Sequence, residues 1–507
     1  MAETILCAKH ISKAFIGVQA LDDVSVEIKS GEIHCLAGEN GSGKSTFVKT
    51  VAGVYASDAG EIILNGHRYT RLTPKQAMDE GVQVIYQDLS LFQHMTVAEN
   101  IAINRLRQSG RRRMDWKEAY RIAREQTERI GVSLDLNATI METSMANRQL
   151  TAICRALAQD AKLLFMDEPT TALTRQEVDN LLKVVTELKA AGLAVVFISH
   201  KLDEVFRVAD QITIFRDGRK VGDFDPHELD QRKLAYHMTG RDVEYPRYRR
   251  SYPDDAPLLR VEKLCKKGNY QDISFEVRRG DILGVTGLLG SGRTELALSL
   301  FGLNPPDSGA IYFDGKQVEI TSPHRAKRTG IALLPEDRST QGMFLDRSIR
   351  ENVSSAMVDE IKRFGLLDLR REEELATDSV KRLRVRTPSI ETLIGSLSGG
   401  NQQKGVIAKW IATGPKLFIM DAPTVGLDIG SKAEIYEMIQ QFAAEGMAII
   451  LITDESEELL ANSSRVMVMS QQRCVAQFGE AELSAPDIAR RIADLISNAE
   501  GREADSQ

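Results

Sequence analysis

The stretch GENGSGKS, from Gly38 to Ser45, decides the fold of the first half of this 507-residue chain. It fits the pattern G-x-x-x-x-G-K-[ST], in which the backbone N–H groups of a glycine-rich loop converge on phosphate oxygens. The preceding residues, GEIHCLA, are typical of a buried strand, and the following residues, STFVKTVAG, are typical of the first turns of a helix. Because a helix N-terminus adds partial positive charge, the sequence predicts a phosphate-binding loop.

Two side chains of this loop have specific expected roles. Lys44 is expected to reach the β- and γ-phosphates of ATP, and the Ser45 hydroxyl is expected to face Mg²⁺. The alternative is a glycine-rich turn that carries a surface lysine. The full set of loop residues expected to bind nucleotide is Gly38, Glu39, Asn40, Gly41, Ser42, Gly43, Lys44, Ser45 and Thr46.

A second motif, LLFMDE, reads as a hydrophobic strand that ends in Asp167 and Glu168. Paired acids on a solvated loop are the alternative. An apolar strand leading directly into the two acids argues against that alternative, because the carboxyl ends of parallel strands are where such sheets present ligands. We expect Asp167 to hold Mg²⁺, through water or through Ser45, and Glu168 to polarise the attacking water.

The chain repeats itself, which indicates two homologous domains. A second glycine-rich loop, GLLGSGRT, begins at Gly287, and a second strand, LFIMDA, ends at Asp421 and Ala422. The distance in sequence between matching residues of the two halves is constant apart from one step of five residues. The matching pairs are Gly38 with Gly287 and Gln87 with Glu336, both 249 residues apart, and Asp167 with Asp421 and His200 with Asp454, both 254 residues apart.

The expected domains are residues 1–240 and 258–507, joined by the segment 241–257, which is rich in Pro, Arg and Tyr and lacks apolar periodicity. Each half begins with β-like runs, continues with a charged helical middle and returns to strand-like runs such as AVVFIS and AIILIT. Short apolar runs alternating with helical patterns predict an α/β fold with a mainly parallel sheet in each domain and an inserted helical subdomain.

Composition excludes several classes of protein. The net charge of −7 argues against nucleic-acid binding as the main activity. The five cysteines are scattered, which indicates a reducing compartment and no structural zinc. The N-terminus lacks the apolar core of a signal peptide, and the apolar runs are far shorter than the roughly 20 residues that span a bilayer. We therefore expect a cytoplasmic chain that does not cross a membrane by itself.

The stretch LSGGNQQK, from Leu397 to Lys404, narrows the class. With the phosphate loop, a glutamine loop, the Asp-Glu-Pro strand and a Ser-His pair in that order, each half resembles an ABC nucleotide-binding domain over nearly its whole length. More narrowly, the duplicated layout resembles the tandem ATPase subunits of bacterial monosaccharide importers of the ribose, galactose, arabinose and xylose type. The supporting stretches are FIGVQALDDVSVEI, YQDLSLFQHMTVAENI, HMTGRD, GRTEL, PEDR and LSGGNQQK.

This resemblance implies an ATPase coupled to transport, with ATP and Mg²⁺ as cofactors and two composite sites. Each site takes its phosphate loop from one half and its signature from the other. The implied partners are an integral-membrane permease, as a dimer, and a periplasmic or lipid-anchored solute-binding protein, with no nucleic acid. The implied location is the cytoplasmic face of the cell (inner) membrane, with the chain bound peripherally.

In the first composite site every expected role is filled. The resemblance assigns catalysis to Lys44, Gln87, Glu168 and His200, and Mg²⁺ binding to Ser45, Gln87 and Asp167. Phe15, which precedes the loop, is expected to stack on adenine. The signature residues that would close this site are Ser398, Gly399, Gly400 and Asn401.

The second composite site departs from the family pattern. Four key residues are replaced, and TSMAN, from Thr143 to Asn147, stands where a signature is expected. Each replacement weakens hydrolysis and all fall in one site, so we expect hydrolysis mainly at the first. Gly287, Gly292, Arg293 and Thr294 are still expected to bind nucleotide. The replacements are Arg293 for Lys44, Glu336 for Gln87, Ala422 for Glu168 and Asp454 for His200.

Three other functions stay open at this stage. One is a soluble twin ABC ATPase acting on the ribosome or on DNA. Ribosome-associated twins carry a long charged linker and DNA-repair twins carry zinc cysteines, and both features are missing from this sequence. The second is a regulatory ATPase without a transport partner, and the third is the ATPase of a nucleoside importer.

Overall fold

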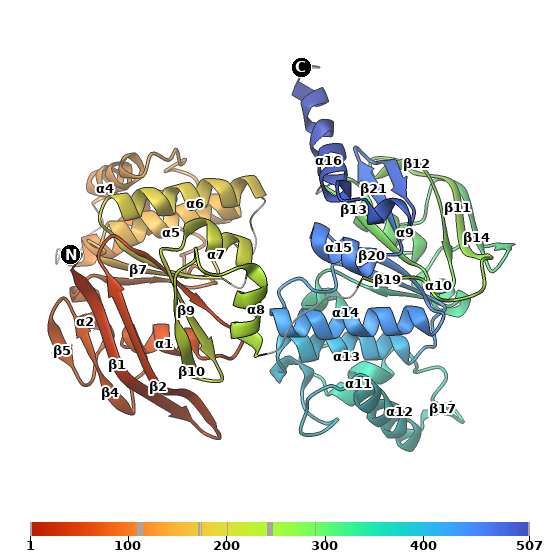
Figure 1. Ribbon diagram of the computed structural model, residues 1–507, viewed down its shortest axis with the longest axis horizontal. Helices are drawn as coiled ribbons and strands as arrows, with labels where there is room; N and C mark the ends of the chain where they lie inside the picture. Colours follow the sequence, from red (N-terminus) through yellow and green to blue (C-terminus); the bar gives the residue numbers. More distant parts are fainter. Residues whose placement is uncertain are drawn as a thin grey trace. The chain divides into compact units, whose positions relative to one another are not determined.

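The protein is represented by a computed structural model, which describes residues 3–108, 115–170, 173, 175–199, 201–240, 247–288 and 290–504. The chain divides into two compact units, Met1–Val243 and Glu244–Gln507 (Figure 1). The division falls within the segment 241–257, whose role as a linker stays a prediction. His200 and Leu289 lie outside the described residues.

Unit 1 contains one antiparallel and one mainly parallel sheet. The antiparallel sheet has the order β2-β1-β4-β5 and is formed by β1 (Thr4–Phe15), β2 (Val18–Lys29), β4 (Ala59–Leu64) and β5 (His67–Tyr69). The other sheet has the order β10-β9-β3-β8-β7-β6, and only β10 runs antiparallel to its neighbour. Its strands are β3 (Ile33–Ala37), β6 (Val82–Ile85), β7 (Leu163–Asp167), β8 (Ala194–Ile198), β9 (Gln211–Arg216) and β10 (Arg219–Phe224).

The helices of unit 1 confirm the expected insertion. Between β6 and β7 the chain forms α3 (Val97–Gln108), α4 (Trp116–Arg129), the 3₁₀ turn η1 (Ile140–Glu142) and α5 (Met145–Leu157). These helices pack on one another and make the helical subdomain. The other helices are α1 (Lys44–Val51), α2 (Pro74–Asp79), α6 (Arg175–Ala190), α7 (Leu202–Val208) and α8 (Gln231–Thr239).

Unit 2 repeats this plan. Its antiparallel sheet has the order β12-β11-β14-β15 and its mainly parallel sheet the order β16-β19-β20-β13-β21-β22. The first contains β11 (Pro257–Lys266), β12 (Tyr270–Arg278), β14 (Ser308–Phe313) and β15 (Lys316–Gln317). The second contains β13 (Ile282–Gly287), β16 (Ile331–Leu334), β19 (Leu417–Asp421), β20 (Ala448–Ile452), β21 (Arg465–Ser470) and β22 (Arg473–Phe478).

The helices of unit 2 follow the same order as the described helices of unit 1, with a short π-helical turn, a 3₁₀ turn before the last helix and a small hairpin in addition. They are α9 (Arg293–Leu300), α10 (Pro323–Thr329), the π turn η2 (Arg338–Gly342), α11 (Ile349–Ser354), α12 (Leu369–Arg382), η3 (Ile394–Ser396), α13 (Gly399–Ile411), α14 (Ile429–Ala444), α15 (Ser456–Asn462), η4 (Glu482–Ser484) and α16 (Ile488–Ala504). The hairpin is formed by β17 (Lys362–Arg363) and β18 (Leu366–Leu367). Among the described residues, no helix has the length and apolarity that a membrane crossing requires.

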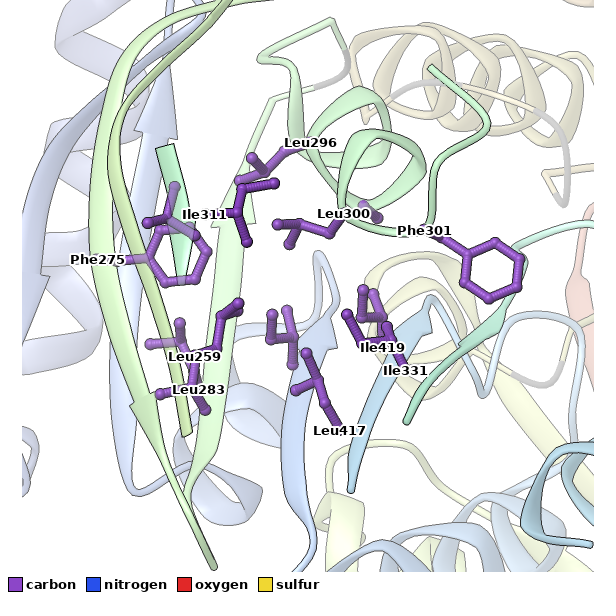
Figure 2. Close-up of a cluster of buried hydrophobic side chains, with 14 of the residues drawn as sticks. Leu259, Phe275, Leu283, Leu296, Leu300, Phe301, Ile311, Ile331, Leu417 and Ile419 are labelled. Carbon is purple, nitrogen blue, oxygen red and sulfur yellow. The ribbon is translucent and has the colours of Figure 1, made fainter. Parts of the chain in front are cut away.

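In each unit the hydrophobic core holds the helix that follows the phosphate loop, α1 or α9, between the two sheets. In unit 2, Leu296 and Leu300 of α9 pack with side chains from both sheets, including Leu259 and Phe275 of the antiparallel sheet and Leu417 of the parallel one (Figure 2). In unit 1, the buried face of α1 lies in the equivalent cluster. Because burial of large apolar side chains stabilises this position, the N-terminus of each helix is held at the end of the preceding strand.

The residues just before β11 belong to the packing of unit 2. Tyr248 is buried, its N–H donates to the Ala461 carbonyl at 2.7 Å, and its hydroxyl donates to the Gly280 carbonyl at 2.7 Å. Burial raises the pKa of Tyr248 to about 12. At least this part of the segment 241–257 is therefore anchored.

Candidate nucleotide-binding sites

The first phosphate loop connects the fully buried strand β3 to α1. Gly43 caps α1 with φ 103°, and a Cβ there would lie 2.6 Å from the Ala20 carbonyl oxygen. A Cβ on Gly38 would lie 2.3 Å from the Phe215 carbonyl oxygen. Only glycine fits at these two positions, because any side chain would collide with backbone. The folded chain therefore needs glycine at the two positions where the motif has it.

Lys44 lies inside this loop rather than in solvent, with 7% of its surface exposed. Its ammonium donates to the carbonyls of Gly38 at 2.7 Å and Glu39 at 2.8 Å. These contacts orient a buried positive charge among the loop N–H groups, as an anion-binding loop requires.

Four of the predicted site residues meet at the carboxyl edge of the parallel sheet. β8 separates β3 from β7, so the loop after β3 and the acids after β7 open at the same edge. The Ser45 hydroxyl donates to Asp167 Oδ2 at 3.4 Å, and Gln87 Nε2 lies 3.5 Å from Glu168 Oε2. Burial, reinforced by Glu168, raises the pKa of Asp167.

The donor set at this edge fits Mg²⁺. The ion prefers oxygen ligands and keeps several waters, so it is bound by few protein groups plus phosphate. A serine hydroxyl within contact of a half-buried carboxylate provides such a partial set. Within the described parts of the chain there is no cluster of three or more His, Cys, Asp or Glu that could hold a metal by itself.

The backbone at Glu168 is unusual and is preserved in the second unit. Glu168 has φ 48° and donates its N–H to the Ile198 carbonyl at 3.0 Å. Ala422 has φ 46° and donates its N–H to the Ile452 carbonyl at 2.9 Å. Left-handed backbone is costly for residues with a Cβ. The turn that carries the Glu168 carboxylate in unit 1 is therefore retained in unit 2, where alanine replaces the glutamate.

A buried glutamate that was not predicted from the sequence, Glu204, supports the end of β8 next to His200, one of the expected catalytic residues. Glu204 accepts the hydroxyls of Thr170 at 2.7 Å and Ser199 at 2.9 Å. It thereby ties the turn after β7 to the end of β8, immediately before His200. In unit 2, Glu458 occupies the matching position and burial raises its pKa to about 7. Sequence offers little signal for such a residue, because it lies on an ordinary amphipathic helix.

Phe15, the predicted adenine platform, has a partner. Its side chain is 42% exposed at the end of β1, and its ring lies 5.1 Å from that of Tyr55 in an edge-to-face arrangement. Lys13 Nζ lies 5.5 Å from the centre of the Phe15 ring. Tyr55 follows α1 closely, so the aromatic pair is attached to the same segment as the phosphate loop. Adenine stacking on Phe15 stays a prediction.

The second phosphate loop repeats the backbone of the first but changes its charges. Gly287 and Gly292 have positive φ like their counterparts, and α9 begins at Arg293. The Arg293 guanidinium, 9% exposed, is paired with the Asp454 carboxylate. The replacement of His200 by Asp454 was expected from the sequence to weaken hydrolysis, whereas the ion pair with Arg293 was not expected.

Asp421 ends β19 beneath this pair. The Thr294 hydroxyl hydrogen-bonds to Asp421, which matches the contact between Ser45 and Asp167. Burial, reinforced by Glu336 and Asp454, raises the pKa of Asp421 to about 6. The second loop can therefore still present backbone donors and a hydroxyl, but the guanidinium of Arg293 is already paired with Asp454.

The intact signature forms the start of α13. Ser398 caps this helix, and Asn401 joins it to the preceding chain by donating Nδ2–H to Ser398 Oγ at 2.9 Å and accepting the Arg386 N–H at 2.8 Å. In unit 1 the matching helix α5 is capped by Ser144, and Met145 beside it is 42% exposed. Unit 2 therefore holds the glycine signature and unit 1 the complete set of loop and acidic residues.

Comparison with known proteins decides the family. The model of the ABC transporter family matches residues 21–171 and 270–425, which is more than half of the chain. The chain belongs to the ABC transporter family. It is a tandem α/β ABC protein, as the duplicated motifs predicted, and an ATPase coupled to transport.

Several curated ABC proteins resemble the chain along most of its length. A protein of Pseudomonas syringae pv. tomato, named putative ribose/galactose/methyl galactoside import ATP-binding protein, is 43% identical over 467 residues, covering 92% of this chain and 89% of that protein. The ribose import ATP-binding protein RbsA 3 of Rhizobium etli is 41% identical and covers 96% of both chains. Among solved structures, the ADP conformation of MJ1267, an ATP-binding cassette of an ABC transporter, matches 47% of this chain and 99% of its own, with 25% identity and a TM-score of 0.43.

Proposed function

We propose that this chain is the ATP-hydrolysing subunit that energises a permease importing a monosaccharide or a similar small polar solute. The observation that carries the proposal is the meeting of Ser45, Gln87, Asp167 and Glu168 beside the buried ammonium of Lys44. Phosphoryl transfer depends mainly on positioning and on electrostatic stabilisation, and this edge of the sheet offers both. The names of the relatives support a sugar as the solute.

The residues of the first loop would act together on ATP. Lys44 and the loop N–H groups bind the β- and γ-phosphates and offset the charge that develops during transfer. Glu168 accepts a hydrogen bond from the attacking water, and Gln87, 3.5 Å from Glu168, restricts where that water can lie. Ser45 and Asp167, with Gln87, would hold Mg²⁺, which supplies further neutralisation of the phosphates. His200 would contact the γ-phosphate from the segment after β8.

Hydrolysis in the assembled protein would be asymmetric. The signature residues Ser398 to Asn401 would close the first loop and supply N–H groups to the γ-phosphate. The loop around Arg293, closed by Thr143 to Asn147, would bind nucleotide without efficient hydrolysis. Its alanine cannot orient water, and Met145 would obstruct the close backbone approach that a signature glycine permits.

The proposed partners are a permease pair and a periplasmic or lipid-anchored solute-binding protein, with this chain attached to the cytoplasmic face of the inner membrane. The surfaces expected to dock the permease are residues 87–95 and 336–344. In these segments Phe92 is 52% exposed and Phe344 is 60% exposed, whereas Leu91 is buried. Cysteines for crosslinking therefore belong at Phe92 and Phe344. The absence of any permease adduct with or without ATP would count against this docking surface.

Transport provides the direct test of the proposed function. Proteoliposomes that contain the chain and its permease, with ATP enclosed and the solute-binding protein outside, would be supplied with external labelled ribose, galactose or a nucleoside. Complexes whose cytoplasmic face points into the lumen would then take up the solute. The expected result is uptake of one of the sugars that disappears with Lys44→Ala and persists with Arg370→Leu, an exchange on the exposed face of α12. Uptake of a nucleoside alone would contradict the sugar assignment. Energy-independent uptake that Lys44→Ala does not change would contradict the function itself.

A further inference from the structure

An arginine in the loop after β16 lies against the signature of the same unit. The loop after β16 passes through Glu336 into the π turn η2, which begins at Arg338. Arg338 Nη1 donates to the Val425 carbonyl at 3.0 Å. A Cβ placed on Gly399 would lie 3.1 Å from Arg338 Nη2, and one placed on Gly426 would lie 3.9 Å from both terminal nitrogens. The guanidinium therefore lies between the turn after β19 and the first glycine of the signature.

The surroundings of Arg338 do not favour its charged side chain. Arg338 is half-buried, and burial lowers its pKa. Its Nε is buried and has no hydrogen-bond partner among the residues that the structure describes. A half-buried guanidinium with an unbonded, buried Nε costs free energy, so the surrounding structure must hold it in place.

The π turn is held at both ends. At its start, Asp337 accepts the N–H groups of Ser339 at 2.9 Å and Thr340 at 3.2 Å. At its end, the Gly342 carbonyl accepts a hydrogen bond from Lys409, which lies on the signature helix α13. The turn and the signature helix are thereby joined at two points, by Lys409 and by the contact of Arg338 with Gly399.

The first unit provides an internal comparison. There Arg155, at the position of Lys409, donates to the carbonyls of Leu89 at 2.8 Å and Ser90 at 2.7 Å, so the attachment of helix to loop is present in both units. The contact between Arg338 and Gly399 has no such counterpart among the residues that replace them in unit 1. Leu89 stands in the sequence position of Arg338, and Met145 stands in that of Gly399. The arginine occurs in the unit that has the glycine, and any side chain at Gly399 would crowd the guanidinium.

We propose that Arg338 is a positioning residue for the signature Ser398–Asn401 and that it sets the rate of ATP hydrolysis at the first phosphate loop. This inference rests on the proposed function, in which that signature closes that loop. The guanidinium is held by its hydrogen bond to the Val425 carbonyl and lies against Gly399. It thereby restricts the start of α13, where Ser398 and the following N–H groups would meet the γ-phosphate. It acts without contacting the nucleotide.

The test measures kcat and KM for ATP in the complex of the full chain with its permease. Arg338→Leu, which introduces the residue of the first unit, is expected to lower kcat about tenfold, the scale of a lost positioning contact, while KM stays within about twofold because the first loop is untouched. Arg370→Leu is the matched control, since Arg370 is an exposed arginine of the same unit. Arg338→Ala with added methylguanidinium is expected to regain several-fold of kcat, and Glu168→Gln is expected to regain none.

The outcomes separate this inference from the proposed function. A kcat unchanged in Arg338→Leu, together with a loss of at least about tenfold in Ser398→Ala, would overturn the role of Arg338 and leave the composite site standing. Unchanged kcat in both variants would overturn the composite site as well. A lower kcat in Arg338→Ala that methylguanidinium does not restore, with a melting temperature lowered in parallel, would reduce Arg338 to a structural residue and contradict the proposal.

Discussion

Asp454→Asn is expected to tighten nucleotide binding at the second phosphate loop. In the structure the Arg293 guanidinium is nearly buried and pairs with Asp454, whose side chain is 75% exposed. A phosphate bound on the other side of the guanidinium would lie two hydrogen-bond lengths away from the carboxylate, which is about 6 Å. The substituted amide would keep the shape of the side chain, remove this repulsion and free Arg293 to pair with phosphate.

The magnitude follows from the exposure of Asp454. For an effective dielectric constant of about 40 to 80, suited to an exposed group, two unit charges about 6 Å apart repel each other by about 1 kcal/mol. That free energy corresponds to roughly a fivefold gain in affinity at 25 °C. Because the interaction is exposed, raising the salt concentration should reduce the gain.

The assay is a titration with a fluorescent ATP analogue in a Lys44→Ala background, which removes binding at the first loop. Asp494→Asn is the control, because Asp494 is an exposed carboxylate on α16 and the change in net charge is identical. Affinity that is unchanged or weaker in Asp454→Asn would refute the reasoning, since it would mean that the carboxylate orients Arg293 for the phosphate rather than competing with it.

Three further predictions concern other parts of the structure. Phe15→Ala should weaken ATP binding by about 1–2 kcal/mol through lost stacking, measured by calorimetry, and unchanged affinity would exclude Phe15 as the platform. Ala422→Gly should stabilise unit 2 by about 1 kcal/mol because it relieves left-handed backbone, whereas Ala433→Gly, inside α14, should destabilise it by a similar amount; urea unfolding that shows the same sign for both would contradict this. Burial lowers the pKa of Lys409 to about 8 from 10.5, so between these pH values the unfolded chain holds a proton that the folded chain has released. The free energy of unfolding of unit 2, relative to that of Lys409→Met, should therefore rise by up to about 3 kcal/mol as pH increases through this window, and this gain should be lost as pH falls through about 8. Parallel curves of stability against pH for the two proteins would contradict the burial of this ammonium.

The parts of the site that depend on local backbone were predictable from sequence. The loops at Gly38 and Gly287 follow from glycine spacing between a strand and a helix, and both connect a strand to a helix in the structure. The alternation of short apolar runs and helical patterns predicted the sheets and the inserted helices, because the spacing of apolar residues and the length of each run indicate which faces of an element are buried. The five-residue step between the halves also left the order of elements unchanged.

The contacts between side chains distant in sequence were not predictable. Arg293 and Asp454 are separated by 161 residues, and their pairing depends on where β13 and β20 lie in the sheet. Tyr55 resembles any aromatic residue at the end of a helix until the fold places it beside Phe15. Arg338 lies within the stretch PEDR, but its position against Gly399 depends on how the fold brings the loop after β16 to the start of α13.

The most direct test of the asymmetric site is the steady-state ATPase rate of Glu168→Gln in the assembled transporter. Glu168 is the carboxylate beside Gln87, and its counterpart Ala422 cannot replace it. The expected result is retained ATP binding with turnover reduced by at least about a hundredfold. Adding Ala422→Glu to this variant should restore nothing, because Met145 and Asp454 still disfavour the second site and residues of one catalytic unit act together. Retention of about half of the wild-type rate in Glu168→Gln would show that the second site hydrolyses ATP and would contradict the asymmetry.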